Sequence, residues 1–224
     1  MIEIIPALMP KSVEDIESFM NRYKDIESVS FVQLDIMDGV LTPYHTWPFG
    51  IKEQKQEQDK LMSLLEVHTH KNLELDLMIF NPFDSLSAFM KWKPRRVIIH
   101  AKAISEDEYL KFLEGAHFKN TEFGIAFTVD DSIDDFKKLI QEIDFVQCMG
   151  ISQIGVQGSL FNEKTYAMIQ HIKQQHPQVP ISVDGGVSMD NCKALKESGV
   201  DRLVSGSLLR DAEKPEDMIQ LVQS

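Results

Sequence analysis

The 224-residue chain is 43% hydrophobic and 26% charged, which is typical of a folded globular protein and leaves enough length to bury one large core. Its 23 basic and 35 acidic residues give a formal net charge of −12 at pH 7, which argues against non-specific binding to nucleic acid or an anionic membrane. The first residues lack a basic region followed by a long apolar one, so we expect no ordinary signal peptide. Cys148 and Cys192 show no metal-ligand spacing and are expected to be buried free thiols of a cytoplasmic protein.

Apolar runs typical of buried parallel strands alternate with helical patterns along the chain. The expected strands cover residues 2–8, 30–37, 73–79, 95–100, 123–128, 145–149, 181–184 and 202–205. Helical patterns begin after Ser12, the expected N-cap, and then cover residues 52–66, 84–93, 106–115, 132–142, 163–174, 189–198 and 215–222. Eight strand–helix pairs without a long linker predict one domain, residues 1–224, folded as a closed (β/α)8 TIM barrel rather than an open doubly wound sheet.

In such a barrel, functional groups lie at the C-terminal ends of the strands. The side chains that fall there are Asp35, Asp76, His100, Met149, Asp184 and Ser205. Asp35 stands between Leu34 and Ile36, where a buried charge is costly without a partner, a ligand or a function. Asp184 precedes two glycines, so a turn or capping role is the alternative for this residue.

Glycines follow each of the last three expected strands. They are Gly155 and Gly158 after the sixth strand, Gly185 and Gly186 after the seventh, and Gly206, next to Ser207, after the eighth. Barrels frequently bind phosphate at this point, because backbone N–H groups and a helix N-terminus converge there without many basic side chains. We therefore expect a phosphorylated ligand, with ordinary glycine turns as the alternative.

Several motifs are spread along the chain: Leu34-Asp-Ile-Met-Asp-Gly39 with Pro43, Leu75-Asp-Leu-Met-Ile79 with Asn81-Pro82, His100, Met149, Ser182-Val-Asp-Gly-Gly-Val187 and Leu203-Val-Ser-Gly-Ser207. In this order they resemble the ribulose-phosphate 3-epimerase family over nearly the whole chain. In that family, two aspartates on opposite faces of the sugar move the proton at C3 of a ketose phosphate through a cis-enediolate. The resemblance assigns these acid/base roles to Asp35 and Asp184.

The resemblance also implies a dry site lined by the methionines Met37, Met78 and Met149, and a divalent metal bound by the two aspartates and two histidines. It implies no organic cofactor. A pair of like groups suits an inversion next to a carbonyl, because acid and base exchange roles when the direction of the reaction reverses.

This chain departs from the family at both metal histidines, where it has Gln33 and Asp76. Gln33, Asp35, Asp76 and Asp184 would form an all-oxygen metal site, which suits Mg²⁺ or Mn²⁺ better than Zn²⁺. The resemblance is thus to a divergent member of the ribulose-phosphate 3-epimerase family, one that lacks both metal-site histidines.

The residues expected to contact substrate also differ from the family pattern. The family's Pro-Gly-Phe-Gly-Gly phosphate loop is replaced by Ser152-Gln-Ile-Gly-Val-Gln-Gly158. His100 is retained, but Lys102 stands where the family commonly has an acid. We hypothesise that the Lys102 ammonium replaces part of the missing metal charge at a developing enediolate, and the alternative is an ordinary solvated lysine.

The expected activity is that of an isomerase of carbohydrate metabolism, inverting C3 of a ketopentose 5-phosphate in pentose phosphate chemistry. Alternatives are a related barrel enzyme on another phosphosugar, such as a ketohexose 6-phosphate epimerase, and a non-catalytic phosphosugar-binding homologue. A related decarboxylase is disfavoured, because residues 35–38 lack the lysine of its Asp-x-Lys-x-x-Asp pattern. The expected partner is a phosphorylated sugar, with self-association into a homo-oligomer as an option.

Overall fold

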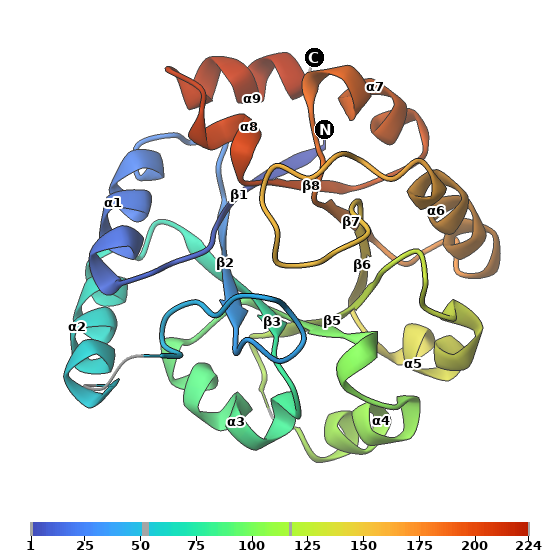
Figure 1. The fold of residues 1–224 in the computed structure, drawn as a ribbon, viewed down its shortest axis with the longest axis horizontal. Helices are drawn as coiled ribbons and strands as arrows, with labels where there is room; N and C mark the ends of the chain where they lie inside the picture. The colour runs from blue at the N-terminus through green and yellow to red at the C-terminus, as the bar shows by residue number, and fades with distance from the viewer. Residues whose placement is uncertain (1, 51–53, 117, 224) are drawn as a thin grey trace.

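The computed structural model describes residues 2–50, 54–116 and 118–223. Eight parallel strands close into a barrel in chain order, and Figure 1 looks down the barrel at the ring of helices around it. The strands are β1 (Glu3–Leu8), β2 (Phe31–Met37), β3 (Asn72–Met78), β4 (Arg96–His100), β5 (Glu122–Phe127), β6 (Phe145–Met149), β7 (Ile181–Asp184) and β8 (Arg202–Ser205). The predicted single (β/α)8 TIM barrel is therefore confirmed.

Helices connect the strands on the outside of the barrel. They are α1 (Val13–Tyr23), α2 (Gln54–Val67), α3 (Pro82–Phe89), α4 (Glu106–Gly115), α5 (Lys137–Glu142), α6 (Lys164–Gln175), α7 (Met189–Glu197), α8 (Ser207–Arg210) and α9 (Pro215–Gln223). Short 3-10 turns occur at η1 (Met90–Trp92), η2 (Ala101–Ala103) and η3 (Ile133–Phe136). Among the described residues, no helix combines the length and apolar character that crossing a membrane requires.

The helix expected at residues 84–93 is shorter in the structure. It ends at Phe89, the 3-10 turn η1 follows, and Lys93 adopts a left-handed conformation with φ of 54°. Pro94 comes next, and a residue before proline is disfavoured in the right-handed helical region. The proline therefore ends the helical run earlier than the apolar pattern suggests.

Two further differences are a later start of one helix and an additional short helix. The helix expected at residues 132–142 begins as the 3-10 turn η3 and becomes α-helical only at Lys137. The short α8, directly after β8, was not anticipated from the periodicity because it spans only four residues. Residues 52 and 53 of the helix expected at 52–66 lie outside the described part of the chain.

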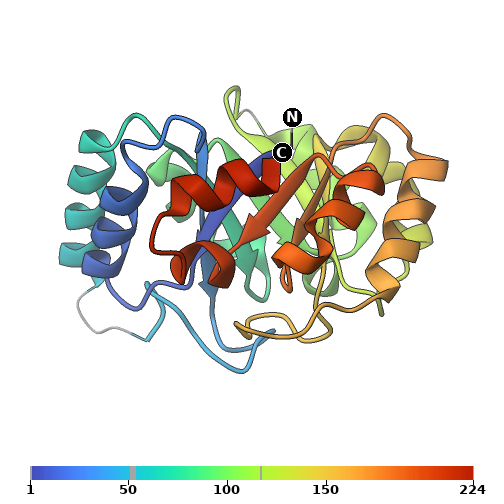
Figure 2. The same ribbon diagram turned by 90° about the horizontal axis from the view of Figure 1, so that it is seen from above.

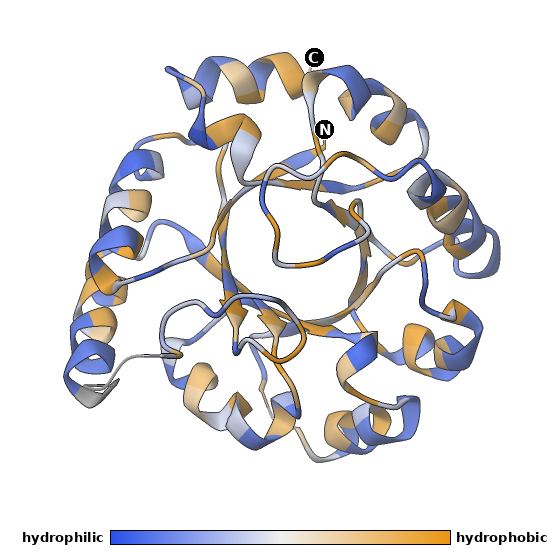
Figure 3. Cartoon of the chain, in the orientation of Figure 1, coloured by the Kyte–Doolittle hydropathy of each residue, from blue (hydrophilic) through white to orange (hydrophobic). Residues whose placement is uncertain are grey.

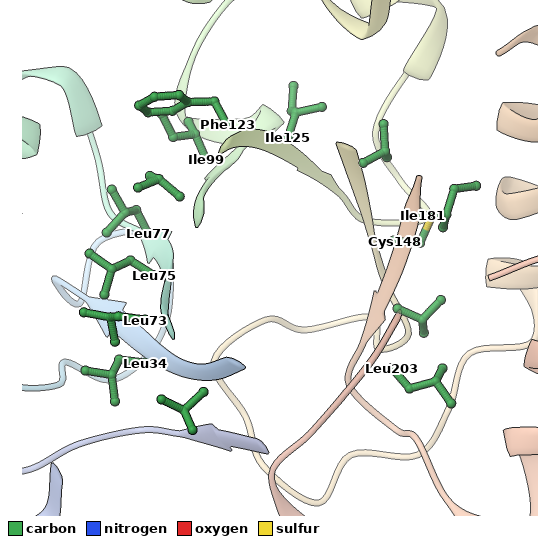
Figure 4. Close-up of a cluster of buried hydrophobic side chains, with 14 of the residues drawn as sticks. Leu34, Leu73, Leu75, Leu77, Ile99, Phe123, Ile125, Cys148, Ile181 and Leu203 are labelled. Carbon is green, nitrogen blue, oxygen red and sulfur yellow. The ribbon is translucent and has the colours of Figure 1, made fainter. Parts of the chain in front are cut away.

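The strands present alternate side chains to two different environments. On the outer face, apolar side chains such as Leu34, Leu75 and Leu203 are completely buried under the helices (Figure 4). Burying a leucine in this way stabilises the fold by roughly 1.5–3 kcal/mol. The helices carry mixed hydrophilic and hydrophobic residues along their length (Figure 3), and α1 is capped as expected, because the Ser12 hydroxyl accepts a hydrogen bond from the Asp15 amide. Cys148 and Cys192 are buried free thiols, as predicted.

The inner face of the barrel carries a network of ion pairs near its N-terminal end. Arg96 donates from Nη1 to Glu3 Oε2 at 3.0 Å and to Glu74 Oε2 at 3.4 Å, and from Nε to Glu122 Oε2 at 2.9 Å. Its guanidinium also lies 3.5 Å from the centroid of the Phe31 ring. Arg202 completes the network, so this end of the barrel interior is filled by paired charges rather than by an apolar plug.

Glu74 in this network should make stability fall as the pH rises. Burial raises the pKa of the Glu74 carboxyl to about 7, although Arg96 and Arg202 act in the opposite direction. Between pH 5 and pH 7 the folded protein holds this proton and the unfolded chain does not. The contribution of Glu74 to the free energy of unfolding is thus complete below the pKa that this carboxyl has in the unfolded chain. It is lost as the pH rises through about 7.

Glu74→Gln should therefore reduce the loss of unfolding free energy between pH 5 and pH 8 by roughly 3 kcal/mol. Denaturant titrations across this pH range measure the effect, with the exposed Glu66→Gln as the matched control. An unchanged slope of stability against pH in Glu74→Gln would show that this carboxyl has no raised pKa.

Candidate active site

Three acids meet inside the C-terminal end of the barrel. Asp35 and Asp76 lie side by side, because they are paired in the register of β2 and β3. Asp184 ends β7, a strand adjacent to neither of them. One carboxylate oxygen from each residue lies within 4.8 Å of the others, so closure of the barrel gathers acids that are far apart in the sequence.

Two buried glutamines and a histidine hold these acids. Gln33 Nε2 donates to Asp35 Oδ1 at 2.8 Å and to Asp184 Oδ2 at 2.9 Å. Gln147 Nε2 donates to Asp76 Oδ2 at 2.9 Å, and His100 Nε2 lies 2.7 Å from Asp76 Oδ1. Each acid therefore has at least one N–H partner, as buried carboxylates require.

The crowding of acids changes their protonation. Burial and the nearby Asp184 and Asp76 carboxylates raise the pKa of Asp35 well above its usual range. Burial and Asp76 raise the pKa of Asp184 to about 7, against the lowering effect of the hydrogen bond from Gln33. A carboxyl with a pKa near neutrality can both give and take a proton under physiological conditions.

The predicted metal ligands are gathered in this cluster but are not all oriented as ligands. The oxygens of Asp35, Asp76 and Asp184 are close enough together to hold a metal ion. Gln33 presents its amide nitrogen to the acids, and its Oε1 has no hydrogen-bond partner in the part of the chain that the structure describes. An amide N–H is a donor and not a metal ligand, so the three carboxylates fit a divalent cation and Gln33, as oriented, does not.

An apolar wall surrounds the acids. Met37, Met78 and Met149 belong to one buried cluster, and each is the last residue of its strand, β2, β3 or β6. Met78 and Met149 also line the pocket above the acids. The predicted methionines are thus brought together at the end of the barrel that holds Asp35 and Asp184.

The pocket has about 530 Å³ of empty space, part of it open to solvent. Both Asp35 and Asp184 line it. The residues predicted to bind phosphate line it as well: Gly155, Gly158, Gly185, Gly186, Gly206 and Ser207. One pocket therefore contains both the acid pair and the glycine-rich strand ends.

Two loops cover the mouth of the barrel. Residues 38–50, after β2, and the β6–α6 loop lie at the same end of the barrel, opposite the two chain termini (Figure 2). They meet at Gly155, where an added Cβ would lie 2.7 Å from both Met37 Sδ and Thr42 Cβ. A residue without a side chain is needed for this close approach, and φ of 75° at Gly155 also favours glycine.

Some residues singled out in the sequence lie outside the pocket. Lys102 is exposed on η2 and does not line the pocket. Asp38, the second aspartate of the first motif, accepts hydrogen bonds from the Val40 and Phe80 amides and so holds two loops in place. His100 is buried against Asp76 and does not line the pocket.

Sequence reasoning missed Gln147 and Gln157. Gln147 lies two residues before Met149 on β6, and this period-two spacing, which places both side chains inside the barrel, was the available signal. Gln157 lines the pocket near Gly206 and accepts a hydrogen bond from Arg210 Nη1 at 2.6 Å. Its position in a loop offered no periodic signal.

The motifs of the sequence agree with a comparison with known proteins. Residues 3–209 match the model of the ribulose-phosphate 3 epimerase family. This chain belongs to the ribulose-phosphate 3-epimerase family. The ribulose-phosphate 3-epimerase of Chlamydia trachomatis serovar D is 27% identical over 201 residues, covering 86% of this chain and 80% of that protein. The one from Helicobacter pylori strain J99 is 28% identical over 213 residues, covering 92% of each.

Solved structures share the fold at low sequence identity. The tryptophan synthase α-subunit of Pyrococcus furiosus has a TM-score of 0.71 and 15% identity, covering 99% of this chain and 96% of the other. A 3-hexulose-6-phosphate synthase has a TM-score of 0.67 and 15% identity, covering 99% and 98%. These likenesses show the (β/α)8 architecture, and membership of a carbohydrate-phosphate epimerase family comes from the sequence matches.

Proposed function

We propose that this protein is an isomerase that inverts C3 of a ketopentose 5-phosphate, with Asp35 and Asp184 as the acid/base pair. The observation that carries the proposal is that both carboxyls line the same pocket as the glycine-rich ends of β7 and β8. A phosphate bound at the glycines would leave the sugar chain to extend toward the acids. The family to which the chain belongs supports the same chemistry.

The proposed reaction uses the two acids in turn. The ionised carboxylate of one aspartate removes the C3 proton, the C3–H electrons form a C2–C3 double bond, and the C2 carbonyl becomes an enediolate oxygen. The protonated carboxyl of the other aspartate then delivers its proton to the opposite face of C3, and the carbonyl reforms. One proton is taken up and one is given, so the acids exchange roles in the reverse reaction.

The electrostatics of the site support this cycle. Raised pKa values of Asp35 and Asp184 favour a state in which the pair holds a proton at neutral pH, which is the state that the reaction requires. The wall of Met37, Met78 and Met149 excludes water from the enediolate, so charges and dipoles near it act more strongly than in solvent.

A divalent cation in this site would be held by Asp35, Asp76 and Asp184. Oxygen ligands favour Mg²⁺ or Mn²⁺ over Zn²⁺. When bound, such a cation supplies Lewis-acid stabilisation of the enediolate oxygens. Comparing the binding of Mn²⁺ and Zn²⁺ to chelator-treated protein by calorimetry tests this preference.

We further propose that the substrate phosphate binds at Gly185, Gly186, Gly206 and Ser207, with the β6–α6 loop closing over it. Gly206 offers a sharp test, because its φ of −83° allows any residue and an added Cβ would be 3.3 Å from Gln157 Nε2. The Gly206→Ala protein should fold, but its added methyl group would lie where the phosphate approaches the backbone.

Gly206→Ala should raise KM for the phosphorylated substrate about tenfold with kcat within about twofold, a loss of roughly 1.4 kcal/mol of binding. Steady-state kinetics measure this split. The matched control is Gly115→Ala at the exposed end of α4, where an added Cβ meets nothing within 4 Å. An unchanged KM in Gly206→Ala would place the phosphate elsewhere.

The function itself is tested by an enzyme-linked assay on ribulose 5-phosphate, with and without added Mn²⁺, with Asp184→Asn as the inactive control. Turnover of ribulose 5-phosphate by the wild-type protein alone supports the proposal. Turnover of a ketohexose 6-phosphate alone would identify an epimerase for that substrate instead. Binding without turnover of either substrate, under every metal condition, would identify a phosphosugar-binding protein instead.

A further inference from the structure

The Gln33 carboxamide joins the two acids of the pocket. Its nitrogen lies 2.8 Å from Asp35 Oδ1 and 2.9 Å from Asp184 Oδ2, so both amide hydrogens are directed to carboxylates on different sides of the barrel. The side chain is completely buried, and its oxygen has no hydrogen-bond partner among the described residues. The hydrogen bonds that orient the amide are therefore those to the two acids.

We propose that Gln33 is a positioning residue that sets the spacing of Asp35 and Asp184 in the cation-free protein, by occupying the position between them that a bridging cation would need. The proposal rests on the proposed function, because it concerns the same acid pair. It also explains how the two acids keep their positions without the histidine-bound metal that the family resemblance implies.

The chemistry of the amide group fits this role. A primary amide has two N–H donors in a planar fork, whereas a neutral imidazole has a single N–H donor. Glutamine at this position can therefore bridge two acceptors, which the histidine of the family pattern could not do while ligating a metal. Hydrogen bonds to ionised acceptors are also stronger than hydrogen bonds to neutral acceptors.

Gln147 extends the bridge to the third acid. Its Nε2 lies 2.9 Å from Asp76 Oδ2 and 3.5 Å from Asp184 Oδ2, and its oxygen also lacks a partner. His100 occupies the other Asp76 oxygen. N–H donors thus tie all three carboxylates together, and any cation must compete with these donors for the same oxygens.

This competition gives a test that does not depend on turnover. Gln33→Met keeps the length of the side chain but removes the donor, so Mn²⁺ should bind to substrate-free Gln33→Met at least about fivefold more tightly than to the wild-type protein, as measured by calorimetry. If Gln33 were a metal ligand through its oxygen, the same substitution would weaken Mn²⁺ binding. Weaker or unchanged binding therefore overturns the proposal.

Kinetics in the presence of chelator provide the second measurement. Gln33→Met should lower kcat about 10- to 100-fold through misplacement of the acids, with KM within about threefold because Gln33 does not line the pocket. Gln170→Met, an exposed change on α6, is the matched control. Wild-type kcat in chelator-treated Gln33→Met would overturn the positioning role while leaving the proposed function intact.

A third measurement uses only the wild-type protein, in case Gln33→Met fails to fold. The Gln33 side-chain amide signals in ¹H–¹⁵N spectra should be protected from exchange in cation-free protein and should lose this protection when saturating Mg²⁺ displaces the N–H groups. Amide signals that show no protection in cation-free protein overturn the proposal. Absence of turnover in every protein would reject the proposed function, and the Mn²⁺ and amide measurements would still decide the role of Gln33.

Discussion

Asp35→Asn and Asp184→Asn are each expected to lower kcat for epimerisation of ribulose 5-phosphate about 10³-fold, with small changes in KM. An amide cannot accept the C3 proton, and general acid–base catalysis by a positioned group contributes about 10²- to 10⁴-fold. The effect should be large because both carboxyls line the pocket and burial raises the pKa of each, to about 7 for Asp184.

Deuterium exchange separates the roles of the two acids. In D₂O, Asp35→Asn retains only Asp184 as a base and should incorporate deuterium at C3 of one epimer without inverting it. Asp184→Asn should do so only with the other epimer. The exposed Asp107→Asn on α4 should behave as the wild-type protein does. Deuterium exchange into the same epimer in both variants would contradict an arrangement with one acid on each face of the sugar at C3.

Arg96→Met is expected to lower the unfolding free energy by about 3–5 kcal/mol. Arg96 pairs with Glu3, Glu74 and Glu122 inside the barrel, and Glu74 is completely buried. Removing one partner of a buried ion network leaves an uncompensated charge, which is far more destabilising than loss of a surface pair. The contact of the guanidinium with the Phe31 ring is lost as well.

The neighbouring Arg95 provides a matched control for this experiment. Arg95 is exposed, and its side chain donates from Nη1 to the Asn120 carbonyl at 3.4 Å, so Arg95→Met should change stability by less than about 1 kcal/mol. Urea denaturation at pH 8, where Glu74 is largely ionised, measures both variants. Equal stabilities of Arg95→Met and Arg96→Met would show that the network contributes nothing beyond a surface arginine.

The sequence by itself predicted the barrel and indicated the acid pair. Apolar runs and helix signals are local patterns, and their regular alternation predicted all eight strands. Asp35 and Asp184 could be proposed because both lie at or near the C-terminal ends of strands, which meet on one face of a barrel, and because the family resemblance assigns them acid/base roles. The glycines after β6, β7 and β8 were expected in the same place for the same reason, and all of them line the pocket.

Only the tertiary structure decided which side chains touch. Gln33 reaches Asp184, and Gln147 reaches Asp76, across strands that are not neighbours, so these contacts depend on the closure and stagger of the barrel rather than on local pattern. The same holds for Arg96 with Glu3. The sequence predicts Gln33 as a metal ligand, whereas in the structure its amide nitrogen faces Asp35 and Asp184. A one-dimensional pattern specifies the face on which a side chain lies, but not the partner that faces it across the barrel.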